Sequence, residues 1–409
     1  MAEPKVRFKK DDGSSYPAWE QGRFGDLIEV YDEKVTSDCT LPVLTSSKTD
    51  GIQYQSDHFG REQLHDITGY NVIPRGYCTY RNRSDGTDFT FNINNLCDRG
   101  IVSKFYPVFH TTARCNLYFL MTLMNNESKT VRKIAMTAKG TGQKVLSFLD
   151  LQKIEINIPS LEEQQKIADF LSSVDEVITA SEQEVANLET QKKAVMKKIF
   201  SQGVRFKRAD GRDFPEWGKC KALDCCKVFC DGDWIESKDQ SERGIRLVQT
   251  GNVGNGFFVE KETRKRFISV ETFDRLHCTE IFAGDILISR LPDPAGRACI
   301  VPDSSERMIT AVDCTIVRPD DNRLITEYLV QFYQSSVHFK YVNNMLAGGT
   351  RQRVSRGNLE EEEVLLPSLE EQRLIADFLS NFDEAIAAAK KELELWKELK
   401  KGLLQKMFV

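Results

Sequence analysis

The stretch PSLEEQQKIADFLSSVDEVI at residues 159–178 recurs as PSLEEQRLIADFLSNFDEAI at residues 367–386. Fifteen of these twenty positions are identical. Each copy opens with Pro followed by a Ser-x-x-Glu capping box, which begins at Ser160 and at Ser368. This pattern is typical of a helix N-terminus, because the serine satisfies a free backbone N–H and the proline disfavours extension backwards. The sequence therefore predicts two related helices, one in mid-chain and one near the end.

Beyond each cap, apolar residues recur at steps of three and four, which is the heptad pattern of a helix buried along one stripe. The first stripe is Ile167, Leu171, Val174, Ile178, Val185, Leu188, Val195 and Ile199, and the second is Ile375, Leu379, Phe382, Ile386, Leu393, Trp396, Leu403 and Met407. A helix of about 40 residues is about 60 Å long. We expect the two helices to pair antiparallel within the chain, about a pseudo-two-fold axis. Packing of each helix on its own domain, or pairing between chains, are the alternatives.

Two further repeats extend the duplication over the whole chain. VRFKKDDGSSYPAW at residues 6–19 matches VRFKRADGRDFPEW at residues 204–217 in eight of fourteen positions, and KKAVMKKIF at residues 192–200 matches KKGLLQKMF at residues 400–408. The chain is therefore predicted to be two tandem modules. The expected domains are a first variable domain at residues 1–158, a first long helix at 159–203, a second variable domain at 204–366 and a second long helix at 367–409.

Between the repeated ends, the two modules share little sequence. Apolar stretches bounded by Gly, Asn and Asp predict strands at residues 70–73, 101–109, 245–249, 285–290, 298–301 and 314–318, and helices are expected at 115–124 and 325–343. A short common element, GTGQKV at residues 140–145 and GTRQRV at residues 349–354, precedes each long helix. We expect an α+β protein with two tandem mixed α/β domains, separated by the two antiparallel coiled-coil helices.

The charge of the chain is unevenly distributed. The net charge is −5, but residues 71–148 carry eleven Lys/Arg against four Asp/Glu, and residues 243–356 carry sixteen against thirteen. Basic variable regions on an acidic scaffold favour phosphate binding, although uneven surface charge is the alternative. The sequence contains no long apolar stretch and no secretory signal, so we expect a cytoplasmic protein without membrane contact.

Few residues suggest catalysis or metal binding. The eleven cysteines form no disulfide-like framework and are expected to be reduced thiols. The tightest group, Cys220, Cys225, Cys226 and Cys230, lacks paired C-x2-C spacing and a nearby histidine, which favours ordinary thiols over structural zinc. Motifs of adenine methyltransferases, phosphate-binding loops, zinc proteases and serine hydrolases are absent. We therefore expect no catalytic residue, no metal site and no cofactor on this chain.

Several of these motifs occur together in a known family. The PSLEEQ…IA.FL segments at residues 159–171 and 367–379, the paired G-T-x-Q-x-V elements, GIVSKFYPVF at 100–109 and GDILISR at 284–290 resemble the specificity subunits of type I restriction–modification systems. The resemblance covers essentially the whole chain. It implies a non-catalytic subunit with two target-recognition domains, each of which contacts one half of a bipartite, asymmetric sequence in double-stranded DNA.

The resemblance also implies partner subunits. Two modification subunits would methylate adenine N6 with S-adenosylmethionine, and restriction subunits would translocate and cut DNA with ATP and magnesium. The alternative is a non-catalytic coiled-coil scaffold whose variable domains bind proteins, which predicts no salt-sensitive affinity for DNA.

Candidate DNA-binding residues follow from side-chain chemistry. Arg contacts guanine bidentately, Asn and Gln contact adenine, and Lys and Arg hold phosphates. The candidates are Gln53, Gln55, Arg81, Asn82, Arg83, Ser84 and Lys104 in the first domain, and Arg264, Lys265, Arg266, Arg290, Arg297, Arg351, Gln352, Arg353 and Arg356 in the second. The alternative for each of them is a solvated or salt-bridged surface residue.

Overall fold

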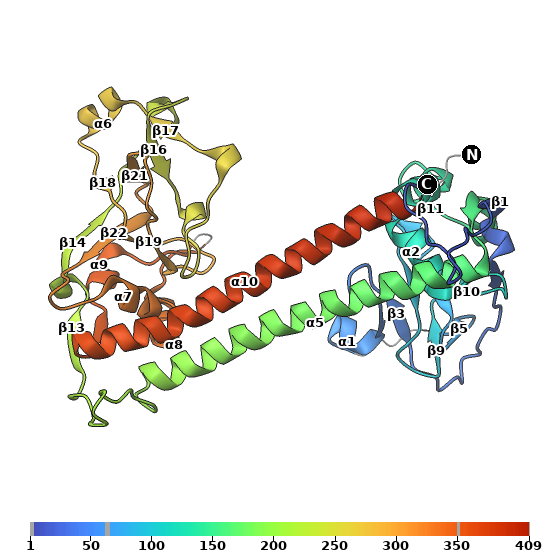
Figure 1. Ribbon diagram of the computed structural model, residues 1–409, viewed down its shortest axis with the longest axis horizontal. Coiled ribbons are helices and arrows are strands. Elements are labelled where there is room, and N and C mark those ends of the chain that lie inside the picture. The colour runs from blue at the N-terminus through green and yellow to red at the C-terminus, as the bar shows by residue number, and fades with distance from the viewer. Residues whose placement is uncertain (1–3, 62–65, 350–351, 409) are drawn as a thin grey trace. The chain divides into compact units, whose positions relative to one another are not determined.

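The computed structural model describes residues 4–61, 66–349 and 352–408, and the chain divides into two compact units (Figure 1). Unit 1 comprises Met1–Glu182 and Lys391–Val409, and unit 2 comprises Gln183–Lys390. Each unit contains one variable domain and a part of both long helices. The expected two-domain, mixed α/β organisation is confirmed.

The long helices are α5 (Leu161–Phe200) and α10 (Leu369–Met407), and they pack together as an antiparallel pair (Figure 1). In unit 1 the beginning of α5 lies against the end of α10, where Lys397 is 3.0 Å from Glu182. In unit 2 the second part of α5 packs along the first part of α10, and near the middle of both helices Lys390 is 2.6 Å from Glu189. All eight stripe residues of each helix are buried or half-buried. The predicted pairing of the two helices within the chain is confirmed.

Unit 1 is built from small antiparallel sheets around an aromatic core. Its strands are β1 (Glu20–Arg23), β2 (Ile28–Val30), β3 (Leu44–Ser46), β4 (Ile52–Tyr54), β5 (Asn71–Pro74), β6 (Cys78–Tyr80), β7 (Arg83–Ser84), β8 (Phe91–Ile93), β9 (Arg99–Val102), β10 (Val108–Thr111), β11 (Lys144–Val145) and β12 (Glu155–Ile158), and its shorter helices are α1 (Gln55–Phe59), α2 (Leu117–Asn126), α3 (Ser128–Thr137) and α4 (Phe148–Gln152). The central sheet has the order β2-β10-β6-β8, and β1 pairs with β12. Phe24, Phe91, Phe109 and Phe119 are almost fully buried in the core, which also includes Phe408 of the C-terminus.

Unit 2 has two larger sheets. Its strands are β13 (Gly218–Lys221), β14 (Cys226–Asp231), β15 (Gln240–Ser241), β16 (Ile245–Val248), β17 (Phe267–Ile268), β18 (Glu280–Ile281), β19 (Ile286–Ser289), β20 (Ala298–Ile300), β21 (Met308–Thr310), β22 (Cys314–Pro319) and β23 (Glu363–Leu366), and its shorter helices are α6 (Val270–Leu276), α7 (Thr326–Tyr333), α8 (Ser336–Met345) and α9 (Arg356–Glu360). One sheet has the order β14-β22-β19-β20 and the other β15-β17-β16-β21-β18, in which only β16 and β21 are parallel. β13 pairs with β23, as β1 does with β12 in unit 1.

Two predicted elements are divided in the structure. The expected strand at 101–109 is β9 and β10, because a turn in which the N–H of Tyr106 donates to the carbonyl of Ser103 reverses the chain. The expected helix at 325–343 is α7 and α8, because α7 ends at Tyr333 and the hydroxyl of Ser335 caps a new helix by accepting from the N–H of His338. The other predicted strands and the helix at 115–124 are present within two residues.

The glutamate of each capping box joins two of the sequence repeats. The Glu163 carboxylate accepts hydrogen bonds from Arg7 at 2.7 and 2.9 Å and from the Trp19 indole at 3.1 Å. In unit 2, Glu371 accepts from Arg205 and Trp217 in the same way. A buried carboxylate is stable when it is paired and fully hydrogen-bonded. The repeats at residues 6–19 and 204–217 therefore occur together with the PSLEEQ repeats because, in each unit, the two segments form one buried hydrogen-bond network.

The glutamine after each glutamate fixes the long helix to the variable domain. The Gln164 amide donates to the carbonyls of Arg114 and Pro159 and accepts from the N–H of Asn116, each at 3.0 Å. Gln372 makes the equivalent three bonds: it accepts from the N–H of Ile325 and donates to the carbonyl of Arg323, both just before α7, and it donates to the carbonyl of Pro367. Both glutamines are fully buried. Each variable domain is thus held at the beginning of its own long helix.

Candidate nucleic-acid interface

Unit 1 brings several predicted residues together where β6 ends. The chain continues from β6 through Arg81 and Asn82 into β7, which pairs with β11. The N–H of Asn82 donates to the carbonyl of Phe105 at 3.1 Å, and the carbonyl of Asn82 accepts from the N–H of Leu146 at 2.9 Å. These bonds place Arg81–Ser84 beside the turn that carries Lys104 and beside the G-T-x-Q-x-V element. We call this group, with Lys144 of β11, the unit 1 cluster.

The unit 1 cluster has a positive charge. Arg81, Arg83 and Lys104 are exposed and Lys144 is half-buried. Within residues 4–61, 66–349 and 352–408, none of these four cations forms an ion pair. The Arg83 guanidinium lies 4.1 Å from the centre of the Phe105 ring, and the Lys104 ammonium lies 5.7 Å from the same centre. Cations without acidic partners are available to phosphates and base edges.

Unit 2 has the same backbone arrangement around Arg290, which follows β19. The N–H of Arg290 donates to the carbonyl of Asp313 at 2.9 Å, and the carbonyl of Arg290 accepts from the N–H of Val354 at 3.2 Å. Ala347 and Arg353 exchange two backbone hydrogen bonds, as Lys139 and Val145 do in unit 1. Arg290 therefore occupies the place of Asn82, and Ala347 and Arg353 correspond to Lys139 and Val145. Aligned by sequence, the two G-T-x-Q-x-V elements pair Val145 with Val354, whereas the backbone hydrogen bonds pair Val145 with Arg353. The two alignments therefore differ by one residue.

The unit 2 counterpart is a partly neutralised arginine cluster. The Arg290 side chain is 5% exposed, donates to the carbonyl of Val312 at 2.6 Å and lies 3.4 Å from Asp231. Arg356 lies 4.0 Å from Asp231, and Arg353 lies 3.7 Å from Asp313. Arg353 and Arg356 are 54% and 42% exposed. Both arginines are exposed enough to contact a ligand, although Arg356 also pairs with Glu360 at 2.8 Å, whereas the Arg290 side chain is buried.

Arg297 is committed to the interior of unit 2. Its guanidinium donates to the carbonyls of Val253, Leu291, Pro294 and Thr250 at 2.7–2.9 Å. These bonds use four of its five N–H groups, and burial lowers the pKa of the side chain. Arg297 therefore stabilises the 291–297 loop, and it has too few free donors for bidentate contact with a base.

The remaining predicted residues lie elsewhere. Gln53 in β4 contacts His58 of α1 at 3.0 Å, and Gln55 begins α1; among the described contacts, none joins either glutamine to the unit 1 cluster. Lys265 pairs with Glu262 and Glu306, while its neighbours Arg264 and Arg266 are exposed. Gln352 is exposed beside Arg353, and Arg351 lies outside the described residues.

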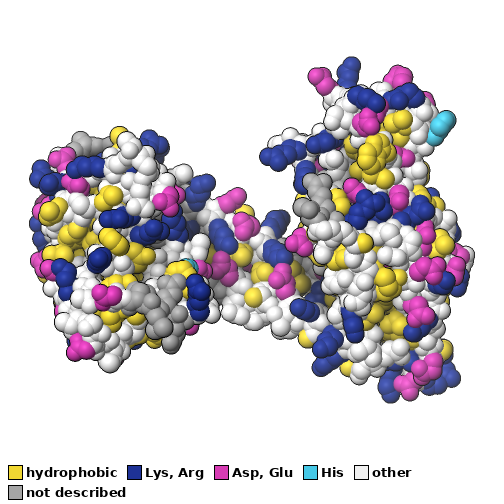
Figure 2. Space-filling model, turned by 180° about the vertical axis from the view of Figure 1, so that it is seen from behind, with side chains coloured by type: hydrophobic (Ala, Val, Ile, Leu, Met, Phe, Trp, Pro, Cys, Tyr) yellow, Lys and Arg dark blue, Asp and Glu magenta, His cyan; other side chains and the backbone are white. Residues whose placement is uncertain are grey.

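Sequence reasoning missed two members of the unit 1 cluster. Lys144 lies in the basic window and in the GTGQKV element, and Phe105 lies in the GIVSKFYPVF stretch, but neither was predicted as a DNA-binding residue. The signal for Phe105 was an aromatic residue next to Lys104, and the signal for Lys144 was a basic residue in an element that both modules share. Figure 2 shows that Lys and Arg are interspersed with Asp and Glu on the visible face of both units. Charge counts alone therefore do not separate free cations from paired ones.

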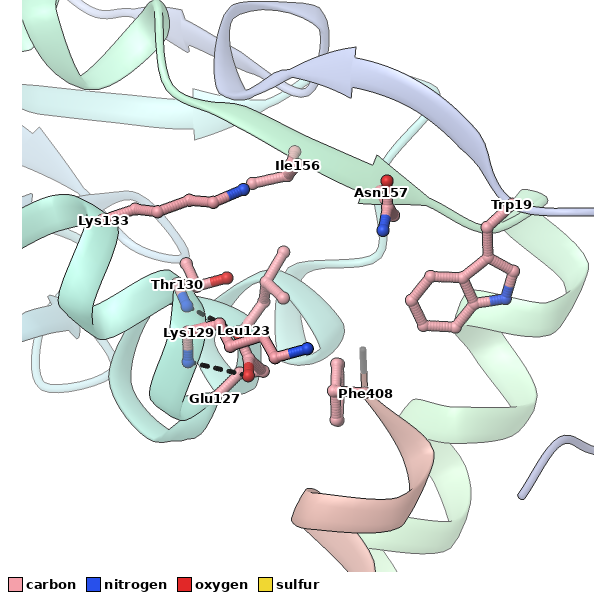
Figure 3. Close-up of a pocket in the computed structure, with 9 residues that line it drawn as sticks. All are labelled: Trp19, Leu123, Glu127, Lys129, Thr130, Lys133, Ile156, Asn157 and Phe408. Atoms are coloured by element: carbon pink, nitrogen blue, oxygen red, sulfur yellow. Dashed lines mark hydrogen bonds between the residues drawn. The ribbon is translucent and has the colours of Figure 1, made fainter. Parts of the chain in front are cut away.

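A small pocket in unit 1 lies where Phe408, near the end of the chain, packs against the variable domain (Figure 3). It is lined by Trp19, Leu123, Glu127, Lys129, Thr130, Lys133, Ile156, Asn157 and Phe408. The buried Glu127 carboxylate accepts from the N–H groups of Lys129 and Thr130 at 2.9 and 2.5 Å, which caps α3. The Phe408 ring makes an edge contact with Trp19 and stacks on Phe119. The acidic group of this pocket is thus used for capping a helix.

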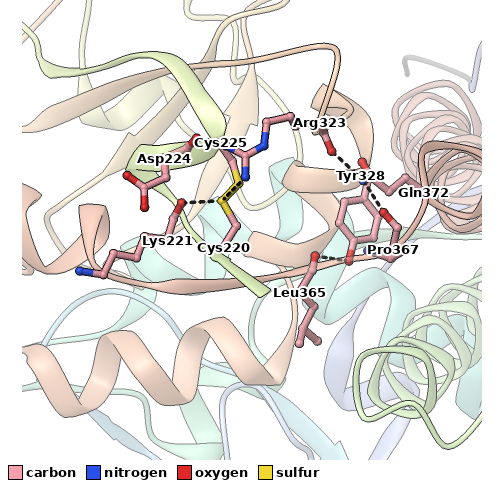
Figure 4. Close-up of a disulfide and its surroundings, with 9 residues drawn as sticks. All are labelled: Cys220, Lys221, Asp224, Cys225, Arg323, Tyr328, Leu365, Pro367 and Gln372. Atoms are coloured by element: carbon pink, nitrogen blue, oxygen red, sulfur yellow. Dashed lines mark hydrogen bonds between the residues drawn. A yellow bond between two sulfur atoms is a disulfide. The ribbon is translucent and has the colours of Figure 1, made fainter. Parts of the chain in front are cut away.

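The cysteine group of unit 2 contains a disulfide. Cys220 of β13 and Cys225 are joined, and a guanidinium N–H of Arg323 donates to the sulfur of Cys220 at 3.6 Å (Figure 4). The expectation that every cysteine is reduced is wrong for this pair, because the turn after β13 brings their Cα atoms to 6.5 Å. Cys226 and Cys230 are free thiols of β14. Among the described residues, no group of three or more His, Cys, Asp or Glu side chains is arranged to hold a metal ion.

Comparison with known proteins identifies the family. A family model for the type I restriction modification DNA specificity domain matches residues 90–190 and 216–395. The chain belongs to this family. It is thus a specificity subunit of a type I restriction–modification system, the component that directs DNA target recognition, and no finding favours the protein-binding scaffold.

Individual relatives agree with this assignment. The MjaVIII specificity subunit of Methanocaldococcus jannaschii is 26% identical over 298 residues, which cover 71% of this specificity subunit and 68% of that protein. The HindI specificity subunit of Haemophilus influenzae is 24% identical over 187 residues, which cover 44% and 40% of the two chains. The crystal structure of a type I S subunit from M. genitalium has a TM-score of 0.58 at 13% identity over 100% of this chain and 99% of that chain, which shows a shared fold. None of the described helices is both long and apolar enough to cross a membrane.

Proposed function

We propose that this specificity subunit directs its complex to a bipartite, asymmetric sequence in double-stranded DNA. The domains at residues 1–158 and 204–366 would each contact one half. The observation that carries the proposal is that the same backbone hydrogen bonds, around Asn82 in unit 1 and Arg290 in unit 2, lie beside different exposed cations. These cations are Arg81, Arg83 and Lys104 in unit 1, and Arg353 and Arg356 in unit 2. One scaffold that presents different donors twice is suited to two different half-sites, since base recognition depends on which side chains are presented and where.

The subunit contributes recognition, and the chemistry belongs to its partners. Two modification subunits supply adenine N6 methylation with S-adenosylmethionine, and restriction subunits supply ATP- and magnesium-dependent translocation and cleavage. Two equivalent docking sites are supported by a repeated apolar surface: Phe170 of α5 and Phe378 of α10 are 38% and 37% exposed. Phe8 and Phe206 pack against them edge-on with ring centres 5.5 and 5.6 Å apart. Paired surfaces of this kind fit two copies of one partner.

The experiment is a methylation map of a genome in cells that express this chain with its modification subunit. Cells that express the modification subunit alone are the control. The proposal expects a split, adenine-methylated motif only when this chain is present, and exchange of residues 218–366 should change one half of it. If the two proteins associate and no motif appears, DNA recognition by these domains is refuted. If they do not associate, the docking assignment is refuted.

A further inference from the structure

We propose that Arg83, held on the ring of Phe105, recognises a guanine in the first half of the DNA target. This inference rests on the proposed function and names one specificity-determining residue and the residue that positions it. It concerns the unit 1 cluster alone.

The Arg83 side chain is oriented without an acidic partner. Its guanidinium lies 4.1 Å from the centre of the Phe105 ring, and no ion pair involves Arg83 among the described residues. An acidic partner would occupy the N–H groups that a base needs. An aromatic ring contacts the face of the guanidinium and leaves the N–H edge free.

The backbone around this pair is fixed. Arg83 lies opposite Val145 in the β7–β11 ladder. The adjacent Asn82 is hydrogen-bonded to Phe105 itself, from N–H to carbonyl, at 3.1 Å. The guanidinium and its supporting ring are therefore joined by a short, hydrogen-bonded path. Such support is what bidentate contact with O6 and N7 of guanine requires, because both hydrogen bonds depend on the orientation of the guanidinium plane.

The arrangement is particular to unit 1. With Asn82 equivalent to Arg290, the place of Arg83 is taken in unit 2 by Leu291, and the place of Phe105 by Asp313. Unit 2 thus has neither the guanidinium nor the ring at these positions. A change at Arg83 should consequently alter the first half of the motif and leave the second half unchanged.

The test compares methylation motifs of four variants expressed with the modification subunits. Arg83→Lys keeps the charge and loses the bidentate fork, so one guanine of the first half should become degenerate, with discrimination falling ~10-fold or more. Phe105→Leu should relax the same position by a smaller factor, and Phe105→Tyr, which keeps a ring, should retain it. Arg75→Lys is the matched control, because Arg75 is an exposed arginine of unit 1 that lies outside the unit 1 cluster and pairs with Asp98 at 2.9 Å, and it should leave the motif unchanged.

The outcomes are distinct. An unchanged first half in Arg83→Lys overturns the inference. Where a variant methylates too little DNA for a motif to be determined, the affinity of its purified complex is measured for duplexes in which single bases are replaced. Equal loss of affinity on all duplexes identifies a contact that carries no sequence information, such as a phosphate contact, and also overturns the inference. The unchanged other positions of the first half report that unit 1 of each variant is folded, whereas absence of any split motif with the wild-type chain refutes the proposed function itself.

Discussion

Lys192 of α5 donates to Asp383 of α10 across 2.6 Å, and the duplication reproduces this ion pair in unit 1 as Lys400 and Asp175 at 2.5 Å. The Lys192 side chain is only 8% exposed, and burial lowers the pKa of its ammonium while Asp383 acts in the opposite direction. Its ammonium also donates to Gln334 at 2.9 Å. The pair thus joins both long helices to the variable domain in unit 2.

Removal of the Asp383 charge should destabilise unit 2. Asp383→Asn leaves a buried ammonium without its anion, and we expect a loss of about 2 kcal/mol in the free energy of unfolding, since Asp383 is itself partly exposed. Lys192→Met, which keeps the apolar stem, should cost less. Lys390→Met removes an exposed pair with Glu189 and should change stability by less than about 0.5 kcal/mol. Urea denaturation of the three variants measures this order, and equal effects would contradict it.

Substitution of each buried glutamate should destabilise mainly the unit that contains it. Glu163→Gln weakens the bonds from Arg7 and Trp19, and Glu371→Gln weakens the equivalent bonds in unit 2. Each change removes charge-assisted hydrogen bonds from a buried site and should cost about 2 kcal/mol. Hydrogen exchange should show lost protection mainly within unit 1 for the first variant and within unit 2 for the second. Equal loss in both units after either change would show that the two networks are not separate.

The disulfide should stabilise only the oxidised protein. The Cys220–Cys225 bond spans five residues, and closure of so short a loop contributes about 2 kcal/mol through the unfolded state. The double variant Cys220→Ala, Cys225→Ala should therefore unfold at lower denaturant concentration than the oxidised wild type, and at nearly the same concentration in reducing buffer. Alkylation of the unfolded, unreduced wild type followed by mass measurement should count nine thiols. A count of eleven would show that the bond is absent.

Buried thiols should make the protein sensitive to alkali. Burial raises the pKa of Cys78, Cys115, Cys226 and Cys299 from the ordinary value near 9 to about 12. The folded state therefore keeps these protons where the unfolded state has lost them. Their contribution is complete below about pH 9 and is lost as the pH rises through about 12, by up to about 1.4 kcal/mol per pH unit for each thiol.

The alkaline effect can be measured at a single thiol. Denaturation of wild type and of Cys226→Ala at pH 8, 9.5 and 10.5 gives the slope of stability against pH. The variant should have the shallower slope because one of the four thiols is absent. Equal slopes would show that Cys226 ionises alike in the folded and unfolded states.

Arg353 should contribute to DNA binding from unit 2. Its side chain lies 3.7 Å from Asp313, but because it is 54% exposed it remains accessible to a ligand. If Arg353→Ala removes a phosphate contact, the affinity for all DNA sequences should fall, and the slope of log affinity against log salt should decrease by about 1. If it removes a base contact, specificity should be lost at one position of the target, at a cost of about 1–3 kcal/mol. Lys219→Ala, which removes a cation paired with Glu363, is the control. Unchanged affinity and specificity would remove Arg353 from the interface.

The features that could be predicted depend on neighbours in the sequence. The stripe from Ile167 to Ile199 follows from helical periodicity, and the beginning of α5 follows from the capping box at Ser160. The division of 325–343 into two helices was missed, because the apolar pattern continues across the break and only Ser335 marks the new cap. In unit 1, the sequence also indicated a basic region without showing which of its cations lack acidic partners.

The sequence by itself determined the duplication, the two long helices, their buried stripes and the family. Repeats and periodicity depend only on the order of residues along the chain. Only the tertiary structure decided which predicted residues meet. Arg83 meets Phe105 because the adjacent Asn82 bonds to the backbone of Phe105, while Arg297 is occupied by four carbonyls from two segments, 250–253 and its own loop. An arginine is available to DNA only if folding leaves its N–H groups unused, and that depends on acceptors brought near it from elsewhere in the chain.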